Sequence, residues 1–242
     1  MQNTEWQNRT QLLLGIPALQ TLANAHVMVL GLGGVGAYAA EMLCRAGVGQ
    51  LTIIDADTVD VTNLNRQLPA LHSTIGKNKT DVLKDRFLDI NPQLKLNIFT
   101  EFLKDERIAC LLDLAHYDYL VDAIDSLAPK VFFLAEATKR NIPVVSAMGA
   151  GAKIDPSQIQ VADISKTHQC HLAAAVRKRL RKMGINKGIK TVFSTEMAPE
   201  TAMIEKTDTL QNKTSVVGTI SYLPAMFGCY CASVCIRDLI NE

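Results

Sequence analysis

The chain has 242 residues, of which 48% are hydrophobic and 20% are charged, and its formal net charge at pH 7 is +1. These values are typical of a soluble globular protein. No apolar run reaches the roughly 18 residues of a membrane span, and the N-terminus lacks the basic-then-apolar order of a secretory signal. We therefore expect a cytoplasmic protein with no membrane partner.

Apolar runs alternate with helical patterns along the first 150 residues. The expected strands are residues 26–31, 51–55, 94–99, 119–125 and 143–149, and the expected helices are residues 37–47, 77–90, 106–114 and 129–140. This alternation predicts an α/β fold, with a Rossmann-like, mostly parallel sheet and helices on both faces. Ligands of such sheets bind beyond the carboxyl ends of the strands, where Gly31, Asp55, Asp125 and Gly149 fall.

The pattern changes after Gly151. Short strand-like pieces at residues 159–164 and 191–196 are followed by an apolar segment, residues 221–240, which we expect to be a helix interrupted by Pro224 and Gly228. No Pro-, Gly- or Ser-rich linker divides the chain. We therefore interpret residues 1–242 as a single domain, with a nucleotide-binding half at 26–150 and a C-terminal extension at 151–242 that shapes the substrate site.

A glycine-rich turn, "GLGGVG", joins the first expected strand to the first expected helix. Its glycines are Gly31, Gly33, Gly34 and Gly36. Glycine permits positive φ, lets the backbone approach a phosphate, and directs the amides of a helix N-terminus at the anion. Asp55 ends the next strand, where a carboxylate can accept from ribose hydroxyls. Both features suit NAD(P), a flavin or ATP, so they leave the nucleotide open.

The residues that follow Asp55 favour ATP. They place polar and cationic side chains in or near one crevice: Asp57, Asn63, Arg66, Gln67 and Lys79. A hydride-transfer enzyme needs an apolar slot for nicotinamide, whereas an enzyme that cleaves between the α and β phosphates needs cations where charge builds on oxygen. Arg66 offers a bidentate fork and Lys79 a compact charge. A lone cation is usually a solvated surface residue, but these two occur together with the turn and Asp55.

The order of the motifs "GLGGVG", "DADTVDVTNLNRQ", "GKNK" and "VDAIDS" resembles the E1-like superfamily of ThiF, MoeB and HesA proteins. That resemblance implies a homodimer that adenylylates a carboxylate with ATP and magnesium and releases pyrophosphate. By position, Asp55 would hold the ribose. The phosphates would be contacted by Asn63, Arg66 and Lys79, and the magnesium ion would be held by Asp125. Arg66, Lys79 and Asp125 would carry the catalysis. Arg9 is the candidate for an N-terminal arginine that reaches the partner's nucleotide.

The branch of the superfamily is indicated by the cysteines and by the C-terminal extension. Activators of sulfur carriers typically add a zinc site of two C-x-x-C pairs, or a catalytic cysteine, but no C-x-x-C pair is present here. The stretch "AGAKIDPSQIQVADISKT", the basic segment after it and the apolar C-terminal segment are similar to the branch of tRNA threonylcarbamoyladenosine dehydratases. This implies ATP-dependent cyclisation of N6-threonylcarbamoyladenosine in tRNA to a hydantoin, through adenylylation of its carboxylate.

The basic segment supports an RNA partner independently. Eight Lys and Arg residues and no acidic residue lie between Asp163 and Glu196, which leaves 17 basic against 24 acidic residues elsewhere. The spacing of Leu172, Val176, Leu180 and Met183 predicts one apolar helix face. An ordinary solvated helix normally mixes charges of both signs. The remaining cations are therefore candidates for tRNA phosphates: Arg177, Lys178, Arg179, Arg181, Lys182 and Lys187.

Three other functions stay open at this point. The first is a ThiF- or MoeB-like adenylyltransferase for the C-terminal glycine of a sulfur-carrier protein, the second an NAD-dependent oxidoreductase, and the third a tRNA-binding adaptor without activity. For Cys229, Cys231 and Cys235 we favour core packing over sulfur handling. A cysteine desulfurase-type sulfur system is the alternative partner that these cysteines leave open.

Overall fold

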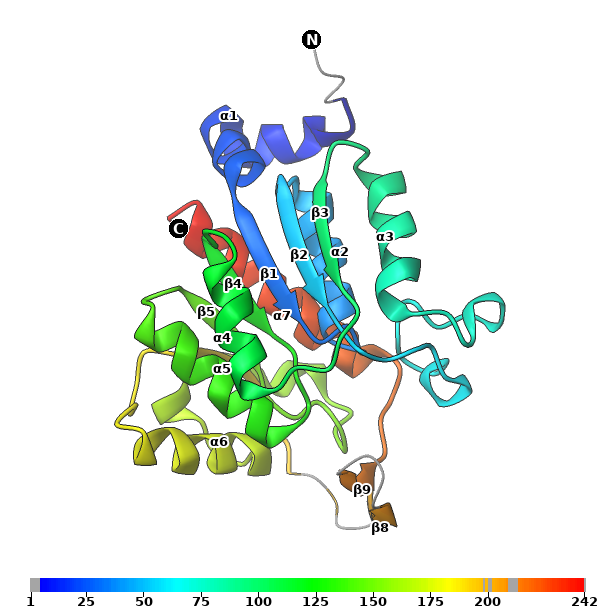
Figure 1. The fold of residues 1–242 in the computed structure, drawn as a ribbon, viewed down its shortest axis with the longest axis vertical. Coiled ribbons are helices and arrows are strands. Elements are labelled where there is room, and N and C mark those ends of the chain that lie inside the picture. The colour runs from blue at the N-terminus through cyan, green and yellow to red at the C-terminus, as the bar shows by residue number, and fades with distance from the viewer. Residues whose placement is uncertain (1–4, 198, 200–201, 209–212, 242) are drawn as a thin grey trace.

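The computed structural model describes residues 5–197, 199, 202–208 and 213–241, and it is built around one seven-stranded sheet (Figure 1). The strand order is β3-β2-β1-β4-β5-β7-β6, and every neighbouring pair is parallel except β6 and β7. The strands of this sheet are β1 (His26–Leu30), β2 (Gln50–Ile54), β3 (Lys95–Phe99), β4 (Tyr119–Asp122), β5 (Val144–Ala147), β6 (Ile159–Asp163) and β7 (Lys190–Ser194). A separate antiparallel hairpin consists of β8 (Met203–Asp208) and β9 (Lys213–Val217).

Helices cover both faces of the sheet. The α-helices are α1 (Asn8–Asn24), α2 (Gly36–Ala46), α3 (Lys79–Ile90), α4 (Asp105–Asp113), α5 (Leu127–Lys139), α6 (His171–Lys182) and α7 (Tyr222–Leu239), and the 3-10 helices are η1 (Glu5–Gln7), η2 (Val61–Asn63), η3 (His72–Thr74), η4 (Pro156–Gln158) and η5 (Ile164–Lys166). One apolar core lies between the sheet and α2, α3 and α7, and a second lies between the sheet and α4, α5 and α6. The predicted fold class is confirmed.

The C-terminal extension contains the predicted short strands but differs from the prediction at its last helix. Its pieces at 159–163 and 190–194 are β6 and β7, which extend the main sheet beyond β5. The predicted interruption of the last helix is wrong, because α7 runs unbroken from Tyr222 to Leu239. Pro224 lies in its first turn, where a missing amide hydrogen costs nothing. A Cβ on Gly228 would overlap the carbonyl oxygen of Val35, so this glycine permits close packing of α7 on α2.

The predicted apolar face of the basic helix is correct except at its end. Val176 and Leu180 on α6 are buried and Leu172 is half-buried, but Met183 is exposed, and its inclusion was wrong. The physical reason is that α6 ends at Lys182. Met183 is the C-cap residue, and Gly184 at φ +80° then turns the chain away.

The two ends of the sheet have different neighbours. α1 lies at the amino ends of β1 and β2, where the amide of Gln50 donates to the carbonyl of Ala25, and α6 and the hairpin lie beyond the opposite, carboxyl ends (Figure 1). The residues expected to bind a nucleotide therefore share one end of the molecule with the basic helix. No helix within the described residues is both long and apolar enough to span a membrane.

Candidate active site

The glycine turn between β1 and α2 requires glycine at two of its positions. Gly31 has φ +86°, and a Cβ placed on it would lie 2.8 Å from the carbonyl oxygen of Ala123. A Cβ on Gly36 would overlap the carbonyl oxygen of Gly31. Gly33 is different, because the nearest atom to its Cβ position is Nε2 of Gln67 at 3.8 Å. The turn is therefore closely packed at Gly31 and Gly36 but open at Gly33, and the open position suits the approach of a phosphate.

Asp55 ties this turn to the end of β2. Its Oδ2 accepts from the amide of Leu32 at 2.6 Å, and its Oδ1 accepts from the amide of Asp57 at 2.8 Å. Burial raises the pKa of the Asp55 carboxyl, while Lys79 and the two amides oppose the rise. The carboxylate thus lies beside the glycine turn, where the sequence predicted a partner for ribose hydroxyls.

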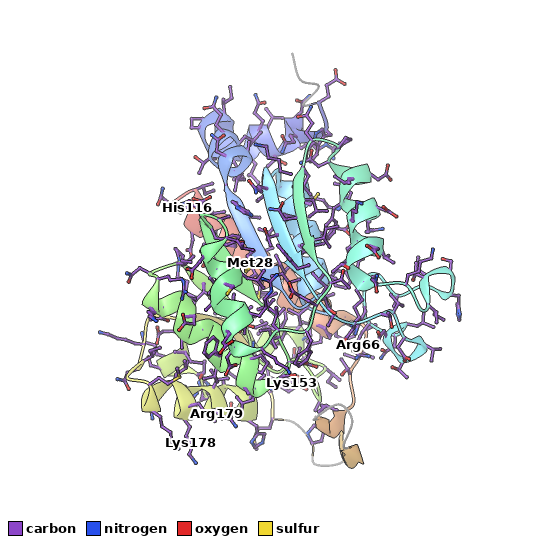
Figure 2. The ribbon with its side chains drawn as sticks, viewed as in Figure 1. Met28, Arg66, His116, Lys153, Lys178 and Arg179 are labelled. Carbon is purple, nitrogen blue, oxygen red and sulfur yellow. The ribbon has the colours of Figure 1, made fainter. Side chains whose placement is uncertain are left out.

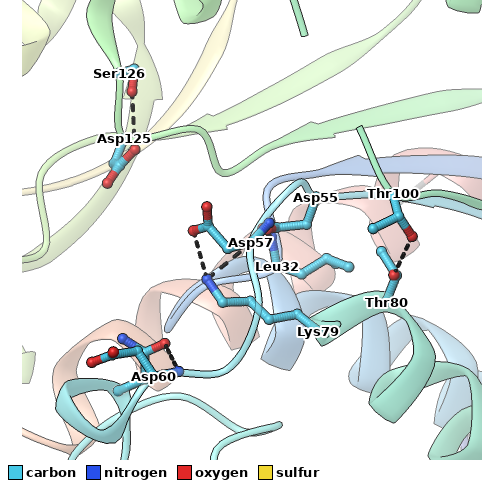
Figure 3. Close-up of polar contacts among 10 residues, drawn as sticks. Leu32, Asp55, Asp57, Asp60, Lys79, Thr80, Thr100, Asp125 and Ser126 are labelled. Carbon is cyan, nitrogen blue, oxygen red and sulfur yellow. Dashed lines mark hydrogen bonds and ion pairs between the residues drawn. The ribbon is translucent and has the colours of Figure 1, made fainter. Parts of the chain in front are cut away.

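Lys79, the first residue of α3, lies beside both aspartates that follow β2. Its Nζ is 2.9 Å from Oδ2 of Asp57 and 4.0 Å from Oδ1 of Asp55 (Figure 3). Only 4% of the Lys79 side chain is exposed, against 66% of the Asp57 side chain. The structure therefore brings together Asp55, Asp57 and Lys79, as the motif spacing suggested, and adds an ion pair that the sequence did not predict.

Arg66 and Asn63 lie on the loop that leaves this crevice. The Arg66 guanidinium donates to the carbonyl of Thr62 at 3.0 Å and to Oδ1 of Asn65 at 2.8 Å. A Cβ on Gly34 would lie 3.5 Å from Cγ of Arg66, so the arginine lies against the glycine turn. Oδ1 of Asn63 accepts from the amide of Asp60 at 3.1 Å in the cap of η2. Asn63 therefore has a structural role in the loop as well as its predicted one.

Gln67 carries an unsatisfied buried atom. Its Oε1 is the single buried side-chain nitrogen or oxygen in the described part of the chain that has no hydrogen-bond partner. A buried acceptor without a partner is rare and costs free energy. The side-chain amide of Gln67 lies near the glycine turn, with its Nε2 3.8 Å from the Cβ position of Gly33. A bound nucleotide that supplies a donor there would satisfy this atom, so the residues present fit the nucleotide that the sequence predicted.

Asp125 lies on the segment after β4, the strand next to β1 on the side opposite β2. The residue is exposed, and Oγ of Ser126 donates to its Oδ1 at 3.3 Å (Figure 3). No cluster of three or more His, Cys, Asp or Glu side chains suited to a metal ion occurs among the residues described. Magnesium commonly binds through one or two carboxylates plus substrate phosphates and waters. A carboxylate on the segment after β4 is consistent with that arrangement.

Arg9 is not close to the other predicted residues of its own chain. It lies in α1, at the amino ends of the strands, whereas the glycine turn and Asp55 lie at the carboxyl ends (Figure 1). Within one subunit the structure therefore does not bring Arg9 to the site. The prediction that it serves a partner's nucleotide is consistent with this placement.

Five of the six predicted tRNA-binding cations are exposed on or just after α6: Lys178, Arg179, Arg181, Lys182 and Lys187. Figure 2 shows Lys178 and Arg179 on the outer side of α6, at the same end of the molecule as Arg66. Arg177 is half-buried and donates to the carbonyl and hydroxyl of Thr167, so it holds the start of α6. Lys190, another cation of the basic segment, pairs with Asp238 at 2.5 Å.

Two buried lysines near the site were missed at the sequence level. Lys130 of α5 forms an ion pair with Asp122 at the end of β4, and neither side chain is exposed. Nζ of Lys153 donates to the main-chain oxygens of Ser194 and Glu196 at 3.3 and 2.5 Å, and burial lowers its pKa (Figure 2). The only signal for the first pair was Asp122 itself, which lies within "VDAIDS" but has no partner nearby in that motif.

The cysteines of α7 are mainly core residues. Cys231 and Cys235 are fully buried, and burial raises the pKa of Cys231 to about 12 and that of Cys235 well above its usual value. Cys229 is half-buried, and burial raises its pKa as well. Neutral, buried thiols react slowly, because the thiolate is the nucleophile. Their placement supports the core-packing interpretation.

A mostly parallel sheet with this glycine turn, Asp55, Lys79 and Asp125 near the carboxyl ends of its strands indicates a nucleotide-binding α/β protein. The chain belongs to the ThiF family, whose model matches residues 7–242. The predicted resemblance to this superfamily is therefore confirmed.

Several proteins that this chain resembles within that class are dehydratases. A tRNA threonylcarbamoyladenosine dehydratase of Bacillus subtilis is 47% identical over 189 residues, which is 78% of this chain and 74% of that protein. The crystal structure of the E. coli tRNA N6-threonylcarbamoyladenosine dehydratase in complex with ATP matches with a TM-score of 0.89 at 37% identity, covering 100% of this chain and 97% of that one. By contrast, the E. coli molybdopterin-synthase adenylyltransferase is 32% identical over 152 residues, or 63% of this chain and 59% of that protein.

Proposed function

We propose that this chain is an ATP-dependent tRNA threonylcarbamoyladenosine dehydratase. The observation that carries the proposal is the full-length structural match to the ATP complex of such an enzyme, at a TM-score of 0.89. A site with Asp55, Lys79 and the glycine turn at one edge suits the same nucleotide. The reaction joins the carboxyl carbon of the threonyl group to the N6 nitrogen of the same modification. It closes a hydantoin ring and removes the elements of one water.

The residues that would hold ATP lie around the glycine turn. The amides of the turn and the N-terminus of α2 would face its phosphates. Asp55 would accept from the ribose, and Lys79 and Arg66 would neutralise the phosphates, assisted by Asn63 and Gln67. When bound, ATP supplies an adenylyl group that turns the carboxylate oxygen into a good leaving group. Asp125 would hold the magnesium ion that accompanies the phosphates.

The contribution of the protein to ring closure is positioning and electrostatic stabilisation. Lys79 and Arg66 would stabilise negative charge on the phosphate oxygens, where it grows in the transition state. The attacking nitrogen and the carboxyl carbon belong to one substituent, so closure is intramolecular, and proximity lowers its barrier. A nucleophilic cysteine is therefore not required, in keeping with the burial of Cys231 and Cys235.

We place the tRNA on the C-terminal half, residues 151–242, with the exposed cations of α6 against its phosphates. Lys178, Arg179 and Arg181 project from the helix without an acidic residue in the same segment. Lys178 and Arg179 lie at the end of the molecule that holds the nucleotide residues (Figure 2). A phosphate backbone held there would leave the modified base free to enter the site. A cytoplasmic location, where tRNA is modified, follows as part of the same proposal.

We also propose a homodimer in which Arg9 of each subunit reaches the nucleotide of the other. Leu12 and Leu13 on α1 are 88% and 81% exposed, so this helix presents apolar surface beside Arg9. A size measurement by light scattering should give twice the mass of one chain. Arg9→Ala should lower ATP affinity without changing that mass.

One experiment tests the central proposal. The protein is incubated with ATP, magnesium and threonylcarbamoylated tRNA, and the nucleosides are analysed by mass spectrometry. Loss of the mass of one water from the modified nucleoside is expected. Its absence under conditions where ATP is bound, together with pyrophosphate exchange stimulated by a small β-grasp sulfur carrier, would assign the chain to the adenylyltransferases instead.

A sulfur-transfer partner has a separate test. The surrounding structure leaves only the half-buried Cys229 partly accessible on α7. Incubation with a cysteine desulfurase and cysteine should leave all three α7 thiols without a persulfide. A persulfide on Cys229 would instead restore the sulfur system as a partner.

A further inference from the structure

A buried polar network lies directly beneath the candidate active site. Nζ of Lys130 is 2.6 Å from Oδ2 of Asp122, and the side chains of both residues are fully buried. Oγ of Ser146 donates to the same Oδ2 at 2.5 Å and accepts from Lys130 at 3.3 Å. The three side chains come from β4, α5 and β5, so the network joins two adjacent strands to the helix that connects them.

Stability alone does not account for such a network. Removing two charges from water is costly, and well-packed apolar residues in place of a buried pair are often neutral or stabilising. Leu120 on β4 and Val131 and Leu134 on α5, the elements that carry Asp122 and Lys130, are buried in one apolar core. Apolar side chains in these three positions could therefore pack the core at least as well. We look instead for a role of the network in positioning neighbouring groups.

The second oxygen of Asp122 points to that role. Oδ1 accepts from the amide of Ile124 at 3.1 Å, which fixes the turn immediately after β4. The amide of Ala123 donates to the carbonyl of Leu30 at 2.9 Å, and the carbonyl oxygen of Ala123 lies 2.8 Å from the Cβ position of Gly31. Residues 123 and 124 therefore link the glycine turn on one side to Asp125 on the other.

We propose that Lys130 and Ser146 are positioning residues that act through Asp122. They hold the Asp122 carboxylate in one orientation, and Asp122 holds the turn at residues 123–125. Asp125 is thereby directed at the phosphates and their magnesium ion. This inference rests on the metal role proposed for Asp125. It adds that the geometry of the metal site is set by a charge pair that touches neither the metal nor ATP.

The test removes the charges in pairs, because a single change would leave one unpaired buried ion. In the Asp122→Asn, Lys130→Met variant, the magnesium concentration for half-maximal activity should rise about 10- to 100-fold, the usual cost of losing a residue that orients a metal ligand. ATP binding measured by calorimetry without magnesium should change less than about twofold, because Asp55 also holds the glycine turn through the amide of Leu32 and Lys79 is unchanged. A matched control, Glu41→Gln with Arg86→Met, breaks an ion pair between α2 and α3 and should leave the magnesium requirement unchanged.

A double-mutant cycle separates positioning from general support of the fold. Asp125→Asn alone tests the proposed metal role, and it should raise the magnesium requirement. Added to Asp122→Asn, Lys130→Met, it should raise that requirement no further, because both changes act on one group. The positioning role would be rejected if the increases in magnesium requirement caused by the two changes multiplied, or if ATP binding were lost equally with and without magnesium. Either result would leave the metal role intact. If Asp125→Asn has no effect, both proposals fail.

A milder variant keeps the test decisive if the double replacement does not fold. Ser146→Ala removes one donor to Asp122 and leaves the ion pair in place. It should raise the magnesium requirement by a smaller factor, about two- to fivefold, less than the loss of the whole ion pair. A normal magnesium requirement in folded Ser146→Ala would contradict the proposal.

Discussion

Lys79 forms an ion pair with Asp57, with Nζ 2.9 Å from Oδ2, yet the lysine side chain is almost fully buried and the aspartate side chain is mostly exposed. The two partners therefore differ in mobility. The Asp57 side chain can rotate toward solvent at little cost in free energy, whereas the Lys79 side chain is held by its surroundings. In the ATP site proposed above, a phosphate would replace Asp57 as the partner of the ammonium group. Asp57 would neutralise the lysine until the nucleotide is bound.

Replacement of Lys79 by Met should remove most of the activity and little of the stability. With tRNA and ATP saturating, kcat should fall about 100- to 1000-fold, the usual cost of one donor that stabilises transition-state charge. The unfolding temperature should change by only a few degrees, because Asp57 is exposed and the largely buried Asp55 keeps the amides of Leu32 and Asp57 as donors. Mass spectrometry of the product nucleoside and a thermal melt measure the two effects. Lys77→Met, an exposed change in the same "GKNK" motif, is the control and should be silent.

The glycines of the turn should separate into two groups when each is changed to alanine. Gly36→Ala should lower the free energy of unfolding by about 2–3 kcal/mol or more, because its methyl group meets the backbone of Gly31. Gly33→Ala should leave stability within about 0.5 kcal/mol, since that position is open. It should instead weaken ATP binding about tenfold or more, as the methyl group occupies the surface offered to phosphate. Urea unfolding and calorimetry distinguish the two, and equal behaviour of both variants would contradict this division.

The exposed cations of α6 should govern the affinity for tRNA but not that for ATP. Changing Lys178, Arg179 and Arg181 together to Gln should raise the KM for tRNA about tenfold or more, and the slope of log K against log salt should become shallower by about 0.7–0.9 for each phosphate that the variant no longer neutralises. The KM for ATP should not change. Lys84→Gln, an exposed change on α3, is the control. An unchanged salt slope in the triple variant would indicate that the tRNA binds to another surface.

The stability of the protein should fall on mild acidification because of His26. The imidazole is buried, its Nδ1 donates to the carbonyl of His116 at 3.0 Å, and its Nε2 accepts from the Thr52 hydroxyl at 2.8 Å. Burial lowers its pKa, so the folded state binds fewer protons than the unfolded state near pH 6. Its contribution is complete above the unfolded pKa of about 6.5 and is lost as the pH falls through the lower folded value.

Urea midpoints at about pH 7.5 and about pH 5.5, on either side of the ordinary histidine pKa, test this sign. The midpoint should be lower at the acidic pH. The difference should shrink in His26→Gln, which carries no titrating group at this position. A rise in the midpoint of the natural chain on acidification would contradict the assignment of a neutral imidazole.

The sequence predicted the parts of the site that depend on local order. Gly31, Asp55 and Lys79 follow or precede regular elements at fixed spacing, so the strand and helix pattern alone was enough to bring them to one edge. The pairing of Asp122 with Lys130 was not predictable, because it depends on how α5 turns against β4. The continuity of α7 was missed for a similar reason, since Gly228 breaks helices in isolation and here is required by its close approach to α2.

The glycine turn is completed from the far end of the chain. Pro224 lies 3.0 Å from the Cβ position of Gly34, and Gly228 lies against Val35, so α7 supports the turn from behind. During synthesis the turn leaves the ribosome long before α7 does. A nascent chain that ends before residue 222 contains β1, the glycine turn and α2 but lacks α7, which packs against the turn. Competence to bind ATP is therefore expected to arise only late in translation, after α7 has packed against the turn.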